Sequence, residues 1–275
     1  MARPVIALLT DFGTRDHYAG TMKGVALAIC PDATLVDISH EIPAHDVLAG
    51  ALELAASYRY FPSGTVFLVV VDPGVGSTRR GIAADSGDYK FVAPDNGVLT
   101  LVLKEAPPKR VVELTERRYA RPTVSRTFEG RDRFAPAAAW LARGIELVAL
   151  GRPAGGVQKL DIPRAAIARL ELPHPRVAED EIEGQVLRVD RFGNLITNID
   201  RKMFEKLAGA GTPLDLHVGS RQVSKVVSTY ADVTAGDVCA LFGSTDHLEI
   251  AANGASAAEE LGLGRGASVH IARRA

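Results

Sequence analysis

Long apolar runs alternate with helical patterns over the first third of the chain. Residues 4–10 (PVIALLT) and 66–71 (VFLVVV) are unbroken apolar runs, which predicts strands buried on both faces of a sheet. Apolar residues at helical spacing predict helices over 16–30 and 45–58, with Thr14 or Asp16 as the first cap, and a strand at 35–38 between them. This order of elements indicates a parallel sheet covered by helices.

The pattern continues in shorter units and then changes period. Residues 81–94 predict two short strands joined by a Ser-Gly-Asp turn, and 126–132 (RTFEGRD) predict a polar loop before a helix of small residues. Prolines recur from 151 to about 181, which predicts a linker. Beyond it, short strands separated by Gly, Asp and Ser turns predict an antiparallel barrel or sandwich, at 184–190, 213–219, 222–230, 237–243, 247–251 and 267–274.

The fold class expected is therefore α/β, in two domains. We expect a three-layer, parallel-sheet domain over residues 1–165, with its linker extending to about 181. A smaller antiparallel β-barrel domain is expected over residues 182–275.

Composition narrows the class of protein without indicating an activity. The hydrophobic fraction of 47% is enough for a sizeable core. The 32 basic and 33 acidic residues are mixed along the chain, so no nucleic-acid partner is expected. No apolar run has the length of a membrane span, and Cys30 and Cys239 lack a C-x-x-C partner. We expect a soluble cytoplasmic protein with two buried free thiols and no membrane partner.

Three carboxylates, Asp11, Asp72 and Asp95, follow predicted strands or lie in adjacent loops. Ligands of open α/β sheets bind at the carboxyl ends of the strands, so these side chains are candidates for chemistry. An arginine near Asp72, such as Arg79, would hold that carboxylate ionised and fixed in direction. Structural alternatives remain open, because Asp11 can bond the start of the next helix and Asp95 its own turn.

The polar motifs further along the chain are also open to two readings. Glu129 with the Arg131-Asp132 pair is either part of a site or a surface charge cluster. Asn194 offers the paired donor and acceptor that an adenine edge requires, and Phe192 or Tyr230 can stack on a base. The alternative is a turn in a barrel.

Two standard sites are missing from the sequence. It contains no G-x-x-x-x-G-K-[ST] or G-x-G-x-x-G motif for binding phosphates. The seven histidines are scattered without metal-ligand spacing, so no metal site is expected.

Six motifs, in this order, resemble the S-adenosylmethionine (SAM) hydroxide adenosyltransferase family, the SAM hydrolases related to fluorinase and chlorinase. They are LLTDFGTRDHYAGTMKGV, VVVDPGVGSTRR, APDNG, TFEGRDRFAPAAA, DRFGNLITNI and GSTDHLEIAANGASAA. The resemblance implies an N-terminal α/β domain, a C-terminal β-barrel, and a homotrimer that holds substrate between one subunit's first domain and its neighbour's second. It implies hydrolysis of SAM to adenosine and L-methionine, with SAM as substrate and no further cofactor.

The resemblance also implies roles for particular residues. Asp72, Arg79 and Glu129 occupy the positions associated with the attacking water. In the nucleoside part of the site, Asp11 would hold the ribose hydroxyls and His45 would lie beside the substrate. Asn194 would bind the adenine, with Phe192 or Tyr230 against its ring face. Asp190 would bind the methionine ammonium and Ser244 its carboxylate, and Asp16 and Asn253 are further binding positions without a separate role.

Two positions depart from relatives of this family. Halogenases carry a tyrosine at the position of Asp72, and an aspartate beside a halide is repulsive, so halogenation is disfavoured. Hydrolase members usually read TFHGRD, whereas Glu129 replaces the histidine here. Two other functions therefore remain open: a non-catalytic SAM- or adenosine-binding module, and a magnesium-dependent phosphohydrolase, which LLTDFGT loosely resembles.

Overall fold

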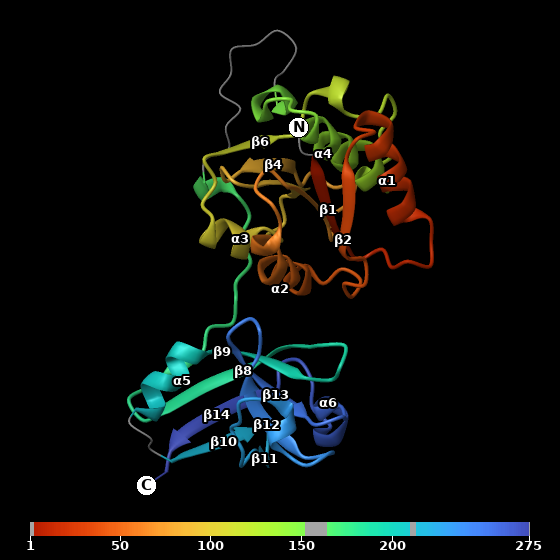
Figure 1. Cartoon of the computed structure of the whole chain (residues 1–275). Coiled ribbons are helices and arrows are strands. Elements are labelled where there is room, and N and C mark those ends of the chain that lie inside the picture. The colour runs from red at the N-terminus through yellow and green to blue at the C-terminus, as the bar shows by residue number, and fades with distance from the viewer. Residues whose placement is uncertain (1–2, 152–163, 210–212, 275) are drawn as a thin grey trace. The chain divides into compact units, whose positions relative to one another are not determined.

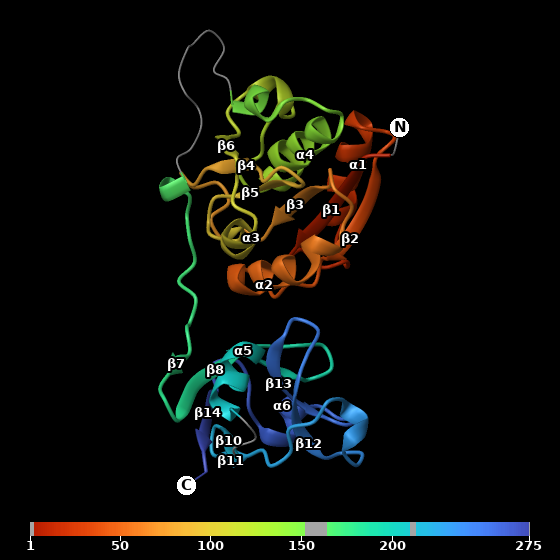
Figure 2. The ribbon, with the colours of Figure 1, turned by 60° about the vertical axis from the view of Figure 1, so that its left-hand side comes forward.

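The computed structural model describes residues 3–151, 164–209 and 213–274 (Figures 1 and 2). The chain divides into two compact units, Met1–Leu170 and Glu171–Ala275. Much of the linker predicted from residue 151 onward, residues 152–163, lies outside the described part. No helix in the described part is long and apolar enough to cross a membrane.

The first unit contains a six-stranded sheet in the order β2-β1-β3-β5-β4-β6. Strands β1, β2, β3 and β5 are parallel, whereas β4 runs antiparallel to both β5 and β6. The strands are β1 (Val5–Thr10), β2 (Thr34–Ser39), β3 (Val66–Val70), β4 (Gly81–Asp85), β5 (Lys90–Pro94) and β6 (Arg110–Glu113). The α/β class is thus confirmed, and the sheet is mixed because residues 81–94 fold back as a hairpin.

Helices cover both faces of this sheet, as the alternation of strand side chains requires. Leu8 and Leu68 face the layer of α1 and α4, whereas Leu9 and Phe67 face the layer of α2 and α3. Figure 2 shows these two helix layers on opposite sides of the sheet. The helical segments are α1 (Tyr18–Ile29), α2 (Val47–Ser57), η1 (Tyr58–Tyr60), α3 (Thr100–Glu105), η2 (Arg117–Tyr119), η3 (Gly130–Phe134), α4 (Ala135–Ala142), η4 (Leu147–Gly151) and η5 (Arg164–Ala166).

Two local predictions in this unit were wrong. Helix α1 begins at Tyr18, after His17, which makes no side-chain cap bond, so neither Thr14 nor Asp16 caps it. The predicted loop over 126–132 ends in η3, a π-helical turn that runs directly into α4. Phe128 within this stretch and Phe134 just beyond it are both buried, so the charged residues between them are held close to the core.

The second unit is a curled antiparallel sheet in the order β11-β10-β14-β8-β9-β13-β12, with β7 paired to β8. Its apolar interior includes Ile182, Leu195, Leu248 and Ile271, which are fully buried. The elements are β7 (Arg176–Val177), β8 (Glu181–Val189), β9 (Leu195–Asp200), α5 (Arg201–Ala208), β10 (Leu214–Val218), β11 (Arg221–Gln222), η6 (Tyr230–Asp232), β12 (Val238–Phe242), β13 (His247–Ala252), α6 (Ala257–Leu261) and β14 (Ser268–Arg273).

The strand predicted over 222–230 was largely wrong. Only β11 forms at its start, followed by an isolated bridge from Val226 to Ala240 and by η6. Val223 is buried, but Val226 is exposed and the stretch lacks the strict alternation of a longer strand. Thr197 and Asn198, within the DRFGNLITNI motif, lie on β9. Both cysteines are buried free thiols, as predicted.

Gly76 joins the loop after β3 to the segment before η3, and only glycine fits there. Its φ is +76°, and a Cβ would lie 2.4 Å from the carbonyl oxygen of Arg126. We expect Gly76→Ala to lower the free energy of unfolding by at least ~1–2 kcal/mol, because of backbone strain and this collision. Chemical denaturation measures the change.

A matched control is Gly24→Ala in helix α1, where nothing lies within 4 Å of the added Cβ. Alanine there should raise stability by roughly 0.5–1 kcal/mol. Equal effects of the two substitutions would contradict the role given to Gly76.

Candidate active site

The carboxyl ends of β1, β3 and β5 carry the three aspartates predicted to share one rim. These strands are parallel neighbours, so Asp11, Asp72 and Asp95 leave the same edge of the sheet. Asp72 follows Val71 at the end of the central strand. The backbone N–H of Gly74 donates to Asp72 Oδ1 at 3.2 Å, which fixes the start of the turn.

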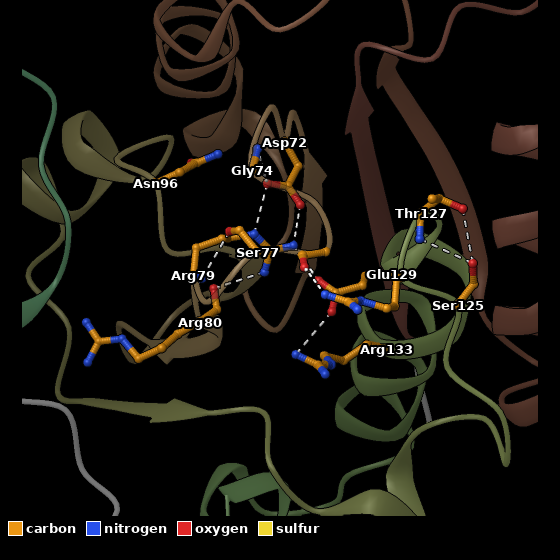
Figure 3. Close-up of polar contacts among 12 residues, drawn as sticks. Asp72, Gly74, Ser77, Arg79, Arg80, Asn96, Ser125, Thr127, Glu129 and Arg133 are labelled. Carbon is orange, nitrogen blue, oxygen red and sulfur yellow. Dashed lines mark hydrogen bonds and ion pairs between the residues drawn. The ribbon is translucent and has the colours of Figure 1, made fainter.

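Arg79 lies between two carboxylates (Figure 3). Its Nε donates to Asp72 Oδ1 at 2.9 Å, and its Nη2 contacts both Asp72 Oδ2 and Glu129 Oε2. The exposed fractions of these side chains are only 5% for Asp72, 10% for Arg79 and 11% for Glu129. Asp72 and Arg79 therefore meet as the sequence predicted, and Glu129 joins them from 50 residues away.

Aromatic packing brings Glu129 to this place. The rings of Phe12, Tyr18 and Phe128 contact one another, which joins the loop after β1 to the residue preceding Glu129. Gly130 lies against the same layer, where a Cβ would be 3.1 Å from the Met22 sulfur. Glu129 is thus positioned by an apolar contact that involves neither of the other charged residues.

The cluster is electrostatically unbalanced. Burial disfavours the Arg79 charge, but the hydrogen bonds and charges of Asp72 and Glu129 outweigh it, so the pKa of Arg79 is raised. The arginine therefore stays protonated, and its ring contact with Phe134, 5.1 Å from guanidinium carbon to centroid, also favours the cation. Two carboxylates therefore share the single positive charge of Arg79. A second cation, Arg133, lies near one of them, with its Nη1 atom 3.4 Å from Glu129 Oε1.

The remaining rim residues have separate partners. Arg80 Nε donates to Asp95 Oδ2 at 2.9 Å, and Asp95 also accepts from the Ala168 backbone, so Asp95 supports structure. The carboxylate of Asp11 accepts from the His45 backbone N–H at 2.9 Å. His45 has a φ of +67°, in the left-handed region, and such strain in a non-glycine residue is often found at functional sites.

The Arg131-Asp132 pair is structural. Asp132 is fully buried, bonds Arg131 at 2.7 Å and accepts from the Ser125 backbone N–H at 2.9 Å. Burial is offset by these bonds, and the pKa of Asp132 is lowered. Only Glu129 from this motif reaches Arg79.

The second unit contains a separate pocket of about 650 Å³, a volume typical of ligand sites. Phe192, Asn194 and Tyr230 line it, as their predicted roles require, together with Ala252, Gly254, Ala255 and Ser256. Gly193 has a φ of +83°, and a Cβ there would lie 2.1 Å from the Ser256 hydroxyl oxygen. This close approach packs the Phe192–Asn194 turn against the start of α6.

Three other predicted binding residues of the second unit, Asp190, Asn253 and Ser244, are not among the residues that line this pocket. The Asp190 carboxylate accepts from the backbone N–H of Phe192 and Asn194 and from the Asn194 amide, each at 2.9 Å, so it orients the pocket turn. The amide of Asn253 donates to the Val233 carbonyl oxygen at 2.8 Å. Ser244 is exposed in the turn between β12 and β13, and Asp16 is exposed before α1.

One group of potential metal ligands occurs within the residues that the structure describes, and the sequence did not indicate it. Glu181, Glu183 and His270 lie on neighbouring strands β8 and β14. Glu181 contacts His270 at 3.1 Å and Glu183 pairs with Arg176 at 3.2 Å. All of them are at least partly exposed, so we assign the group no function.

Sequence reasoning missed Arg133. The residue is four positions beyond Glu129 and meets it because residues 130–134 are helical. A helical reading of 126–134 would have paired the two by their spacing.

Comparison with known proteins identifies the family. Models of the SAM hydroxide adenosyltransferase N-terminal and C-terminal domains match residues 6–151 and 184–270. The chain belongs to the SAM hydroxide adenosyltransferase family.

Relatives of this family match over nearly the whole chain. An (R)-S-adenosyl-L-methionine hydrolase from Thermus thermophilus is 39% identical, over 98% of this chain and 99% of its own. A protein of the same name from Salinispora tropica is 37% identical over 98% and 97%, and a fluorinase from Actinopolyspora mzabensis is 30% identical over 99% and 98%. The crystal structure of an uncharacterized conserved protein from Thermotoga maritima has a TM-score of 0.88 at 36% identity, covering 98% of this chain and all of that one.

The Asp72–Arg79–Glu129 arrangement of this family member allows a test of stability. We expect Arg79→Met to lower the free energy of unfolding by ~3–5 kcal/mol, because it leaves two nearly buried carboxylates without their shared cation. Urea denaturation at neutral pH measures this loss.

Arg133→Met is the matched control. The Arg133 side chain is 32% exposed and lies farther from Glu129, so its loss should cost less than about 1 kcal/mol. If both variants lost the same amount, Arg79 would not be the cation on which the cluster depends.

Proposed function

We propose that the protein hydrolyses SAM to adenosine and L-methionine by attack of water at C5′. The observation that carries this proposal is the paired carboxylate arrangement around Arg79 at the carboxyl rim of the sheet, in a chain belonging to the SAM hydroxide adenosyltransferase family. The names of the full-length relatives support the same activity.

The reaction makes few chemical demands. The oxygen of water forms a bond to C5′ while the C5′–sulfur bond breaks. The electron pair of the broken bond stays on sulfur, which leaves as neutral methionine thioether. Because a sulfonium is a good leaving group, the main task is to hold the water in line with that bond. Positioning of this kind is worth up to about 7–11 kcal/mol in ideal cases.

Asp72 and Glu129 are placed for this task by one guanidinium. Each carboxylate keeps an oxygen lone pair beyond its bond to Arg79, and so can accept a hydrogen bond from the water. The proton that water loses passes to one of these carboxylates and then to solvent. Two negative charges around one buried cation also favour a positively charged sulfonium nucleoside over a neutral one.

The remaining residues support substrate binding in this proposal. Asp11 holds the ribose hydroxyls and His45 flanks the substrate, whereas Asn194 binds the adenine edge between Phe192 and Tyr230. We propose Ser244 as a contact of the methionine carboxylate, and Asp190 as the residue that orients Asn194. We further propose that the protein is a cytoplasmic homotrimer with sites at the subunit interfaces. Its molecular mass in solution tests the trimeric state.

The two alternative functions have less support. A magnesium-dependent phosphohydrolase of the type considered needs a second aspartate two residues after Asp11, where Gly13 stands. A non-catalytic binding module is disfavoured because Asp72, Arg79 and Glu129 remain in contact.

The first test is the product of a SAM incubation. We expect adenosine and methionine in equal amounts by chromatography, at the same rate with and without EDTA. Release of S-adenosylhomocysteine would indicate methyl transfer instead, and binding of SAM without any product would favour the non-catalytic module.

The second test separates turnover from binding. Asp72→Asn keeps the shape but loses the charge that accepts the proton, so kcat should fall by roughly 10²–10⁴-fold, far more than the affinity for SAM. Glu129→Gln should lower kcat less, and Glu129→His should retain activity, because an imidazole can also hold the water. Equal losses in kcat and affinity for Asp72→Asn would show a binding or folding role instead.

A further inference from the structure

Asn96, from the APDNG motif, has no part in the proposed mechanism. It follows β5, and its side chain is partly buried. Its amide nitrogen donates to the Val71 carbonyl oxygen at 2.8 Å, and its amide oxygen accepts from the Val98 backbone N–H at 3.1 Å. In Figure 3 the side chain points toward the segment that carries Asp72. Asn96 therefore joins the loop after β5 to the end of β3.

The carbonyl that Asn96 holds lies past the paired part of the two strands. The register of β3 with β5 ends at Leu68 and Val92. Pro94, the last residue of β5, has no N–H that could extend the pairing. The side-chain amide of Asn96 thus continues the connection between the strands as far as Val71.

The bond from Asn96 acts on the backbone of Asp72. The Val71 carbonyl and the Asp72 N–H belong to one planar peptide unit. A donor that holds this carbonyl fixes the rotation of the unit, and with it the direction in which the Asp72 side chain leaves the backbone. That direction brings Asp72 Oδ1 to 2.9 Å from Arg79 Nε.

The other end of the same loop is fixed without Asn96. The Asp95 backbone N–H donates to the Arg80 carbonyl oxygen at 2.9 Å, next to the pairing of β4 with β5. Arg79 Nη1 donates to the same carbonyl at 3.1 Å. The backbone of the neighbouring strand therefore supports the Arg79 end, whereas its link to the Asp72 end is a side-chain bond.

We propose that Asn96 is a positioning residue for SAM hydrolysis, which holds the Val71 carbonyl and so aims the Asp72 carboxylate at the attacking water. The inference rests on the proposed function and deepens it, because it assigns part of kcat to a residue that acts through another. Such alignment matters because a displacement of about 1 Å can lower a rate roughly 10²-fold.

The experiment compares kcat for SAM with adenosine affinity in the full-length protein. We expect Asn96→Ala to lower kcat by roughly 10–100-fold, because the peptide unit before Asp72 loses its anchor. Adenosine affinity, measured by calorimetry, should change less than about twofold, because none of the proposed nucleoside contacts lies on this loop. A loss of affinity as large as the loss of kcat would overturn the inference.

Asn96→Asp separates the two bonds of the side chain. It keeps an oxygen for the Val98 N–H but has no N–H for the Val71 carbonyl. We expect kcat to fall at least as far as in Asn96→Ala. Full activity of Asn96→Asp would show that the bond to Val71 is not needed, and would overturn the inference.

Asn198→Ala is the matched control. The Asn198 amide also donates to a backbone carbonyl, that of Pro173 at 2.9 Å, and accepts from a backbone N–H, that of Gln185 at 2.8 Å. It lies on β9, in the second unit. Its loss should lower the melting temperature to a similar extent as Asn96→Ala but leave kcat within about twofold of the unmodified protein. Equal losses of kcat would indicate a general effect of stability instead.

A double variant tests whether Asn96 acts through Asp72. In the Asp72→Asn background, Asn96→Ala should lower kcat by less than about threefold, because the group that it aims is already disabled. Losses that multiply in full would overturn the inference.

The outcomes also separate this inference from the function on which it rests. Unmodified protein that releases no adenosine and methionine from SAM would overturn both. Turnover that is the same in the unmodified protein and in Asn96→Ala would overturn the inference alone. Should Asn96→Ala fail to fold, Asn96→Asp decides the matter, because it keeps the bond that shapes the turn.

Discussion

At the carboxyl rim of the sheet in the first unit, one guanidinium forms hydrogen bonds to two carboxylates. Arg79 joins the end of β3, through Asp72, to the start of η3, through Glu129. Among the described residues neither acid has another cation as close, so loss of the arginine would leave two nearly buried carboxylates without their shared cation. A buried ion pair adds little to net stability, but it is severely destabilising when one partner is lost. The same interaction that orders the rim therefore also aligns the two carboxylates that we propose to hold the water.

Part of this site follows from the sequence, because its determinants are local. The apolar run of β3 places Asp72 at a strand end, and the glycine-rich turn that follows returns Arg79 to it within seven residues. The parallel topology then gathers three aspartates at one rim. The contact with Glu129 has no such local signal. It depends on aromatic packing between the segments around residues 12 and 128, which a pattern of apolar spacing does not reveal.

In the second unit, the sequence indicates which residues line the pocket better than it indicates what each polar side chain binds. Phe192 and Asn194, in the turn before β9, and Tyr230, in η6, line one pocket. Asp190 and Asn253, however, use their polar atoms on the backbone of neighbouring turns. A short polar side chain beside a turn has local partners within reach, so its residue type alone does not distinguish a ligand contact from a turn bond.

Glu129, where the hydrolase motif usually has a histidine, adds a negative charge to the site. A neutral imidazole would leave one carboxylate paired with one guanidinium, whereas a glutamate adds a second negative charge to a nearly buried cluster. The π-helical turn supplies Arg133 one turn later, within ion-pair distance of the added acid, and so offsets part of that charge. The carboxylate still accepts from Arg79 and retains lone pairs for water. The substitution is thus compatible with hydrolysis, because the next helical turn offsets part of the added charge and Glu129 still accepts a hydrogen bond from Arg79.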